Sequence, residues 1–157
     1  AHHFGNISGL ITAVATVSFI DLAKLLRTAL KRSALNDADG LEAICEAYLK
    51  FAERKPARYK IMFSDATRDR SDAGYNAASL DAFEILRDTI KTHRGNSNDG
   101  KTEEDVCASR ALFIWSALHG FATLENARRL ELLKAPLRSE TDEDLRRKFL
   151  DVLLLTS

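Results

Sequence analysis

The sequence predicts an all-α fold, a multi-helix bundle of about six helices. Only two prolines and seven glycines interrupt the 157 residues. Apolar residues recur at helical spacing, and no long alternating Val/Ile/Thr run marks a strand. With 45% hydrophobic and 29% charged residues, the composition is that of a globular protein, and its length suits one domain with one core.

The first helix is predicted over residues 7–35. Asn6 precedes it and is expected to cap it, because its side chain can accept a hydrogen bond from a first-turn amide. The apolar residues of this helix form two stripes: Leu10, Val14 and Val17, then Phe19, Leu22, Leu26 and Leu30. A helix with two apolar faces is buried on both, or links one packed unit to another. The polar run at 36–40 ends it.

The second and third helices are expected at about 41–54 and 56–63. Lys55-Pro56 separates them, because proline disfavours the helical conformation of the residue before it. Pro56 then suits the first turn of the short third helix, where its missing N–H costs nothing.

The last three helices are predicted over about 73–92, from about 103 to at least 124, and from about 142 onward. Thr102 with Asp105, and Thr141 with Asp144, resemble capping boxes at the start of the last two. These two long helices carry an apolar surplus that no other helix obviously covers. The sequence therefore predicts a two-fold homodimer through the last two long helices; the alternative is that both pack on the core. The expected interface residues are Ile114, Leu118, Leu145, Phe149 and Val152.

Charge and cysteine usage limit the function. Lys+Arg and Asp+Glu both total 23, so the chain lacks the positive excess of a freestanding nucleic-acid binder. Cys45 and Cys107 lie in apolar helical patterns and are interpreted as reduced core thiols. No membrane span or signal peptide is expected, which favours a cytoplasmic protein.

No Ser-His-Asp order, HExxH helix, P-loop or glycine-rich phosphate loop occurs, so the chain is expected not to be an enzyme. No cofactor is expected and no metal site. Adjacent side chains on a helix point about 100° apart, so His2 and His3 make a poor pair of metal ligands.

Three segments, in order, resemble the TetR family of transcriptional regulators. Residues 2–6 (His-His-Phe-Gly-Asn) are similar to the end of the recognition helix of its helix-turn-helix and the turn after it. Residues 48–63 (Tyr-Leu-Lys-Phe-Ala-Glu-Arg-Lys-Pro-Ala-Arg-Tyr-Lys-Ile-Met-Phe) and 115–124 (Trp-Ser-Ala-Leu-His-Gly-Phe-Ala-Thr-Leu) are similar to the signatures of one subgroup, whose C-terminal domain is nicknamed WHG. The chain departs from the family at Ala1, where an aromatic is usual, and at Ile7-Ser8, where Lys-Glu is usual.

This resemblance implies a domain plan and a function. Residues 1–6 would end the recognition helix of a largely missing DNA-binding head, 7–35 would connect it, and 36–157 would bind ligand and dimerise. The chain would belong to a ligand-responsive regulator, a repressor, that binds operator DNA through an N-terminal helix-turn-helix and responds to a small apolar effector. The alternatives are a helical dimerisation or interaction domain without an effector, and a small-molecule carrier or cofactor-independent enzyme.

The resemblance also suggests site residues. His2 and His3 would lie at the DNA-binding end, although a tag remnant is an alternative. His119 either anchors a ligand or is a core histidine bonded to a backbone carbonyl. For each remaining ligand-site candidate, the alternative is plain core packing. The expected ligand-binding residues are Tyr59, Met62, Phe63, Phe83, Leu86, Phe113, Trp115 and His119.

Overall fold

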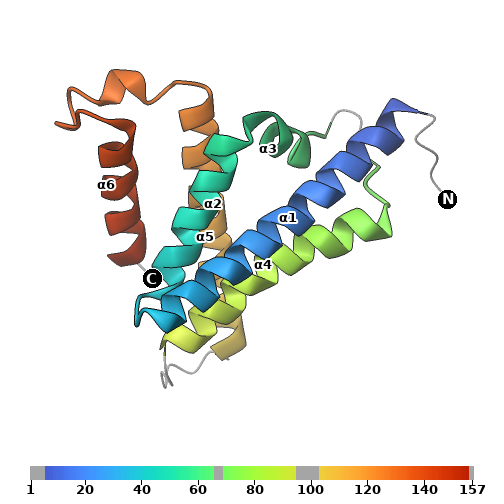
Figure 1. The fold of residues 1–157 in the computed structure, drawn as a ribbon, viewed down its shortest axis with the longest axis horizontal. Coiled ribbons are helices and arrows are strands. Elements are labelled where there is room, and N and C mark those ends of the chain that lie inside the picture. The colour runs from blue at the N-terminus through green and yellow to red at the C-terminus, as the bar shows by residue number, and fades with distance from the viewer. Residues whose placement is uncertain (1–5, 66–68, 95–102, 156–157) are drawn as a thin grey trace.

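The computed structural model describes residues 6–65, 69–94 and 103–155 (Figure 1). Within these ranges the chain forms six α-helices and no strand, which confirms the all-α prediction. The elements are α1 (Ile7–Leu35), α2 (Gly40–Arg54), α3 (Pro56–Met62), α4 (Ala73–Arg94), α5 (Glu103–Asn126), the 3-10 turn η1 (Glu131–Leu133) and α6 (Asp142–Leu155).

The helix starts follow local capping chemistry. The amide of Gly9 donates to Oδ1 of Asn6 at 2.6 Å, which confirms the predicted cap of α1. Asp39 caps α2 in the same way, accepting from the amides of Leu41 and Glu42. Pro56 occupies the first turn of α3, as predicted.

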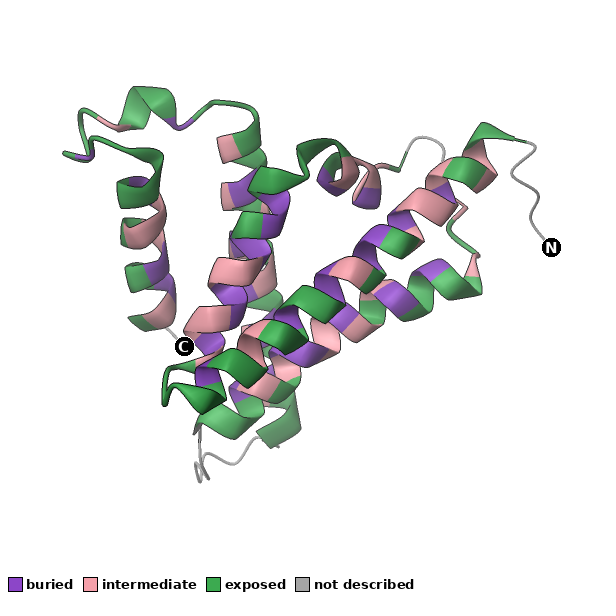
Figure 2. Cartoon of the chain, viewed as in Figure 1, coloured by how far each residue is buried: buried purple, intermediate pink, exposed green. Residues whose placement is uncertain are grey.

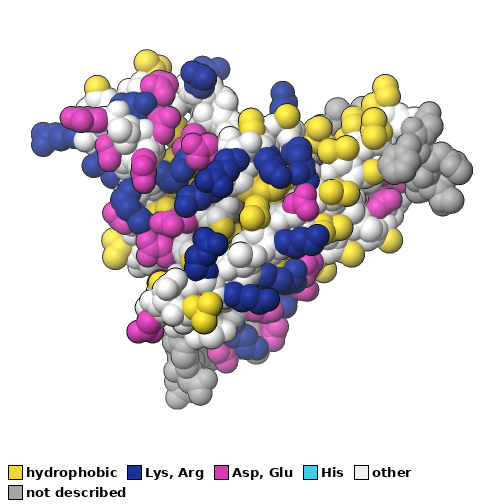
Figure 3. All heavy atoms as spheres, viewed as in Figure 1, with side chains coloured by type: hydrophobic (Ala, Val, Ile, Leu, Met, Phe, Trp, Pro, Cys, Tyr) yellow, Lys and Arg dark blue, Asp and Glu magenta, His cyan; other side chains and the backbone are white. Residues whose placement is uncertain are grey.

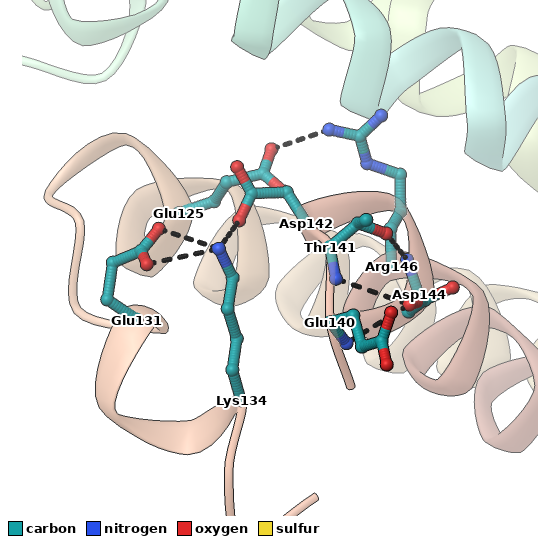
Figure 4. Close-up of polar contacts among 8 residues, drawn as sticks. All are labelled: Glu125, Glu131, Lys134, Glu140, Thr141, Asp142, Asp144 and Arg146. Carbon is teal, nitrogen blue, oxygen red and sulfur yellow. Dashed lines mark hydrogen bonds and ion pairs between the residues drawn. The ribbon is translucent and has the colours of Figure 1, made fainter. Parts of the chain in front are cut away.

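The start of α6 is held by a reciprocal capping box (Figure 4). The amide of Asp144 donates to Oγ1 of Thr141 at 3.1 Å, and the amide of Thr141 donates to Oδ2 of Asp144 at 3.2 Å. This confirms the predicted signature. The corresponding prediction at Thr102 lies outside the described residues.

The helices α1 and α4 run side by side in the same direction, and α2 and α5 form a second pair that crosses them (Figure 1). The inner faces of these four helices form the core, and Figure 2 shows their buried residues turned toward one another. Phe19 and Leu22 of α1 and Tyr48 of α2 are among its largest fully buried side chains. The site described below lies beside this core, against α3.

The helix α6 is separate from the α1–α4 pair, and it is held against α2 and α5 by Arg146 and by one aromatic pair. Arg146 donates to Glu125 of α5 at 2.9 Å and to Glu53 of α2 at 3.0 Å. Phe149 stacks on Phe121 of α5 with ring centroids 4.5 Å apart. These contacts fix the face that α6 leaves outward.

Three of the predicted interface residues are covered by the chain itself. Ile114 is 1% exposed and Leu118 2% exposed, and Leu145 is also buried. The expectation that these three face a partner subunit is therefore corrected: they belong to the stripe that α5 and α6 turn inward. Phe149 is half-buried and Val152 is 63% exposed, so both remain accessible.

The two apolar stripes of α1 have different environments. Phe19, Leu22 and Leu26 are buried, whereas Leu10 and Val17 are exposed. Figure 3 shows hydrophobic side chains gathered on the surface over the N-terminal part of α1. By length and composition α1 is apolar enough to cross a membrane, with a window of mean hydropathy 1.7, which corrects the expectation that no stretch approaches a span. Such a helix is also what a packed core requires, and the inner face of α1 contacts α2, α3 and α4.

Both cysteines are free and buried, as predicted. Burial raises the pKa of Cys45 to about 12. Its thiol is therefore protonated at neutral pH and packs as a small apolar side chain.

Candidate ligand-binding cleft

A cleft of about 620 Å³ lies between α3 and the C-terminal half of α5. Its volume falls within the range of small-molecule sites, about 300–1,000 Å³. One wall comes from α3 and the residues after it, and the other from α5 and the residue after it. The lining residues are Pro56, Ala57, Tyr59, Lys60, Phe63, Ser64, His119, Thr123, Asn126 and Ala127.

Three rings form the inner wall of the cleft. Tyr59 and Phe63 are four positions apart, so they lie on the same side of α3. The ring centroid of His119 lies 4.2 Å from that of Phe63 and 5.6 Å from that of Tyr59. The cleft therefore has a rigid aromatic wall with one imidazole set into it.

A buried chain of hydrogen bonds supports His119. The hydroxyls of Tyr48 and Tyr59 are 2.7 Å apart, and the Tyr59 hydroxyl is 2.6 Å from Nδ1 of His119. Each hydroxyl has one proton to donate. If Tyr59 donated to Tyr48, the Tyr48 proton would have no other acceptor among the described hydrogen bonds, and Tyr48 is only 2% exposed. The network is satisfied when Tyr48 donates to Tyr59 and Tyr59 donates to Nδ1.

This direction assigns the state of His119. An Nδ1 that accepts a hydrogen bond carries no proton, so the neutral ring carries its proton on Nε2. Burial acts in the same sense, because it lowers the pKa of His119 below its usual value of 6.5. The cleft thus contains a neutral imidazole whose Nε2–H is a donor.

The two phenols at and behind the cleft wall stay neutral. Burial raises the pKa of both Tyr48 and Tyr59, so neither phenol ionises at neutral pH. The described residues that line the cleft include one lysine and neither a carboxylate nor a thiol. Among the residues that the structure describes, no group of three or more His, Cys, Asp or Glu side chains could hold a metal ion.

The structure brings three of the eight predicted ligand residues together: Tyr59, Phe63 and His119. Met62 is fully buried in the core. Leu86 and Trp115 line only a void of about 10 Å³, and Phe83 packs on Trp115 with ring centroids 5.8 Å apart. For these four residues the packing alternative fits the structure.

Phe113 lies outside the cleft, 55% exposed on the outer face of α5. It precedes His119 by six positions, and at about 100° per residue the two side chains point some 120° apart. Its prediction as a cavity residue is therefore corrected. His2 and His3 lie outside the described residues.

Several cleft residues were missed from the sequence, and helical spacing from those found points to them. Thr123 lies four positions after His119, and Asn126 and Ala127 continue that face of α5. Lys60 and Ser64 extend the α3 wall. Tyr48 is not among the predicted ligand residues, because sequence spacing does not reveal that its hydroxyl lies 2.7 Å from that of Tyr59.

Two other surface hollows have comparable size. One of about 530 Å³ lies beside the N-terminal half of α1, and one of about 550 Å³ lies between the ends of α1 and α4. Neither contains any of the predicted ligand residues. The α3–α5 cleft is therefore the candidate site.

The fold and the cleft define an all-helical domain with a small-molecule-sized site beside its core. Residues 41–147 match the family model "Tetracyclin repressor-like, C-terminal domain". Because the match covers more than half of the chain, the chain belongs to this family, the C-terminal domains of TetR-family regulators. No curated protein and no solved structure matches the chain.

Proposed function

We propose that this chain is the effector-binding domain of a cytoplasmic, ligand-responsive transcriptional repressor that controls DNA binding by an N-terminal helix-turn-helix. The effector occupies the cleft between α3 and α5. The observation that carries the proposal is the cleft itself, in which His119 is the polar anchor of an otherwise mainly apolar and aromatic wall. The membership in the TetR family supports the regulatory role.

The helix α3 joins this cleft to α1 through Arg58. Its Nε donates to Oγ of Ser18 at 3.0 Å, and its terminal nitrogen donates to Asp21 at 2.6 Å. Arg58 is the neighbour of Tyr59, so one short helix holds the ligand on one side and α1 on another. A ligand that repositions α3 therefore moves the attachment point of α1.

A second contact runs through Phe63. Its ring centroid lies 5.5 Å from that of Phe19, a fully buried residue of α1, and 4.2 Å from that of His119. Phe63 is thus shared by the cleft and the core. A ligand shifts the equilibrium between the DNA-binding and the DNA-released states only as far as its affinities for the two states differ. Contacts that change when α3 moves can provide this difference in affinity.

The regulator acts as a homodimer in this proposal, through the outward faces of α5 and α6. Val152 is exposed on α6, and Leu112 and Phe113 are exposed on α5. A two-fold axis would cover these apolar side chains by pairing each face with its copy.

The first test is the gene sequence upstream of Ala1, where the proposal expects a helix-turn-helix pattern. The second is the affinity of the gene product for promoter DNA, measured by fluorescence anisotropy with and without a bound ligand. Arg58→Met should keep ligand binding and lose the effect of ligand on DNA affinity. The matched control is Arg27→Met, which removes an Arg–Asp pair of 2.6 Å between α1 and α4 and should keep the response. If no ligand that binds in the cleft changes the affinity for DNA, the proposal is refuted.

A further inference from the structure

We propose, on the basis of the function above, that the effector is a small amphipathic carboxylate whose carboxylate oxygen accepts the hydrogen bond of His119 Nε2–H, while its apolar body lies along the α3 wall. The family resemblance implies only an apolar effector; the carboxylate headgroup and the histidine atom that recognises it go beyond that expectation.

The first step is the direction of the buried hydrogen bonds. Tyr48 donates to Tyr59, and Tyr59 donates to Nδ1 of His119. Among the hydrogen bonds of the described residues, Nε2 of His119 has no partner, and His119 lines the cleft. The cleft therefore offers a fixed donor at this point.

The hydrogen-bond network disfavours a ligand that donates to Nε2 of His119. A ligand that donates to Nε2, such as an amine, needs the proton moved to Nδ1. Nδ1–H would then donate to Tyr59, Tyr59 would donate to Tyr48, and the Tyr48 proton would lose its acceptor in a buried position. The protein thus discriminates acceptors from donors through two hydroxyls that the ligand does not touch.

The third step is charge. Among the described residues that line the cleft, Lys60 is the only charged one. The other polar lining residues are Tyr59, Ser64, His119, Thr123 and Asn126. The amide nitrogen of Asn126 is already engaged by the carbonyl of Ala52 at 3.2 Å. One cation and one neutral N–H donor, without a carboxylate among the lining residues, suit a single negative charge.

The fourth step is shape. Pro56, Ala57, Phe63 and Ala127 supply apolar surface in the same cleft. A simple inorganic anion would leave this surface wet, whereas an alkyl or aryl carboxylate covers it. The observations therefore favour a carboxylate with an apolar body over a free anion.

The experiment is calorimetric titration of the chain with four probes that share one alkyl tail: octanoate, methyl octanoate, 1-octanol and octylamine. Octanoate should bind most tightly, about tenfold or more above the ester, because hydrogen bonds to charged groups are the stronger ones. Octylamine should bind most weakly. If the ester, alcohol or amine binds as tightly as octanoate, the carboxylate proposal is overturned while the cleft remains an effector site. If no probe binds, both proposals fail.

Two variants distinguish the loss of the His119 Nε2–H donor from a general loss of folding. In His119→Asn the amide can still accept from Tyr59, but the Nε2–H donor is gone. Octanoate affinity should therefore fall about tenfold and ester affinity by less, because the ester accepts a weaker hydrogen bond than the carboxylate. In His119→Gln the longer amide reaches toward the position of Nε2 and should retain part of the preference. His93→Asn, at an exposed histidine outside the cleft, is the control. Equal losses for ester and carboxylate in His119→Asn would contradict the proposal.

The tautomer provides a readout that is independent of affinity. Long-range ¹H–¹⁵N spectra of the chain should show the proton of His119 on Nε2, both free and with octanoate. A proton on Nδ1 in the free protein would overturn the inference, because the hydrogen-bond chain would then run the other way.

Discussion

The hydroxyl of Tyr59 lies 2.6 Å from Nδ1 of His119 and joins α3 to α5 across the floor of the cleft. The same tyrosine adjoins Arg58, which binds α1. The site and the helix proposed to carry its signal are therefore connected through two successive residues of one short helix. The following predictions test this connection and the structure around it.

Removal of the Tyr59 hydroxyl should destabilise the fold. Tyr59→Phe leaves Tyr48 and Nδ1 of His119 without their partner, and a buried unsatisfied group costs about 1–3 kcal/mol. The double variant Tyr48→Phe/Tyr59→Phe should cost less than the sum of the two single variants, because it also removes the Tyr48 hydroxyl that Tyr59→Phe alone leaves unpaired. Urea unfolding of the four proteins gives these free energies. Strict additivity would contradict the shared network.

His119 should make the stability of the folded chain depend on pH. Burial lowers its pKa in the folded state, whereas the unfolded chain takes up a proton below about 6.5. The unfolded state therefore binds more protons there, and the folded state loses stability as the pH falls below that value. His119→Asn should lose less over the same range in thermal unfolding. Burial raises the pKa of Glu125, so this residue stabilises the folded state as the pH falls, opposite to His119. Both proteins contain Glu125, so its contribution cancels when their pH profiles are subtracted. Parallel pH profiles for the two proteins would show that His119 is not desolvated.

Arg146 should be required for the position of α6. Arg146 and Glu125 have side chains only 13% exposed, and their ion pair links α6 to α5 (Figure 4). Arg146→Met leaves the Glu125 carboxylate without its main partner and should cost about 2 kcal/mol of unfolding free energy. Adding Glu125→Gln should restore part of this loss. Lys134→Met, which removes surface pairs with Glu131 and Asp142, should change the stability little. Equal effects at Arg146 and Lys134 would contradict this account.

A charge on the outer face of α6 should dissociate the proposed dimer. Val152→Glu places a carboxylate on the apolar surface that a two-fold interface would bury, so the sedimentation coefficient should fall to that of a monomer. Leu80→Glu introduces the same charge at an exposed leucine of α4 and should have no effect. Sedimentation velocity of the unaltered chain as a monomer at every concentration would contradict the dimer proposal.

The helices and their ends were largely predictable from the sequence, because local chemistry determines them. Asn6, Pro56 and the Thr141–Asp144 box act over three or four residues, and each does in the structure what its type predicts. The end of α5 at Asn126 is less local, and the sequence predicts only that the helix reaches at least residue 124.

The candidate site was predictable in part. Tyr59, Phe63 and His119 were found, but Phe113 and Trp115 were assigned to the same wall because aromatic type alone does not say which side of α5 is covered. That depends on which neighbour packs there, and the small void beside Trp115 shows that the core fills the space. The interface predictions at Ile114, Leu118 and Leu145 are wrong for the same reason, because these residues are buried within the chain.

The most direct test of the central claim is hydrogen exchange, followed by mass spectrometry, on the chain with saturating octanoate. We expect octanoate to change the exchange protection of the backbone amides of α3 and of α1 around Ser18 and Asp21. In Arg58→Met the change in α3 should remain and the change in α1 should disappear. If octanoate changes amide protection only around the cleft of the unaltered chain and leaves α1 unchanged, the proposed link from the cleft to α1 is contradicted.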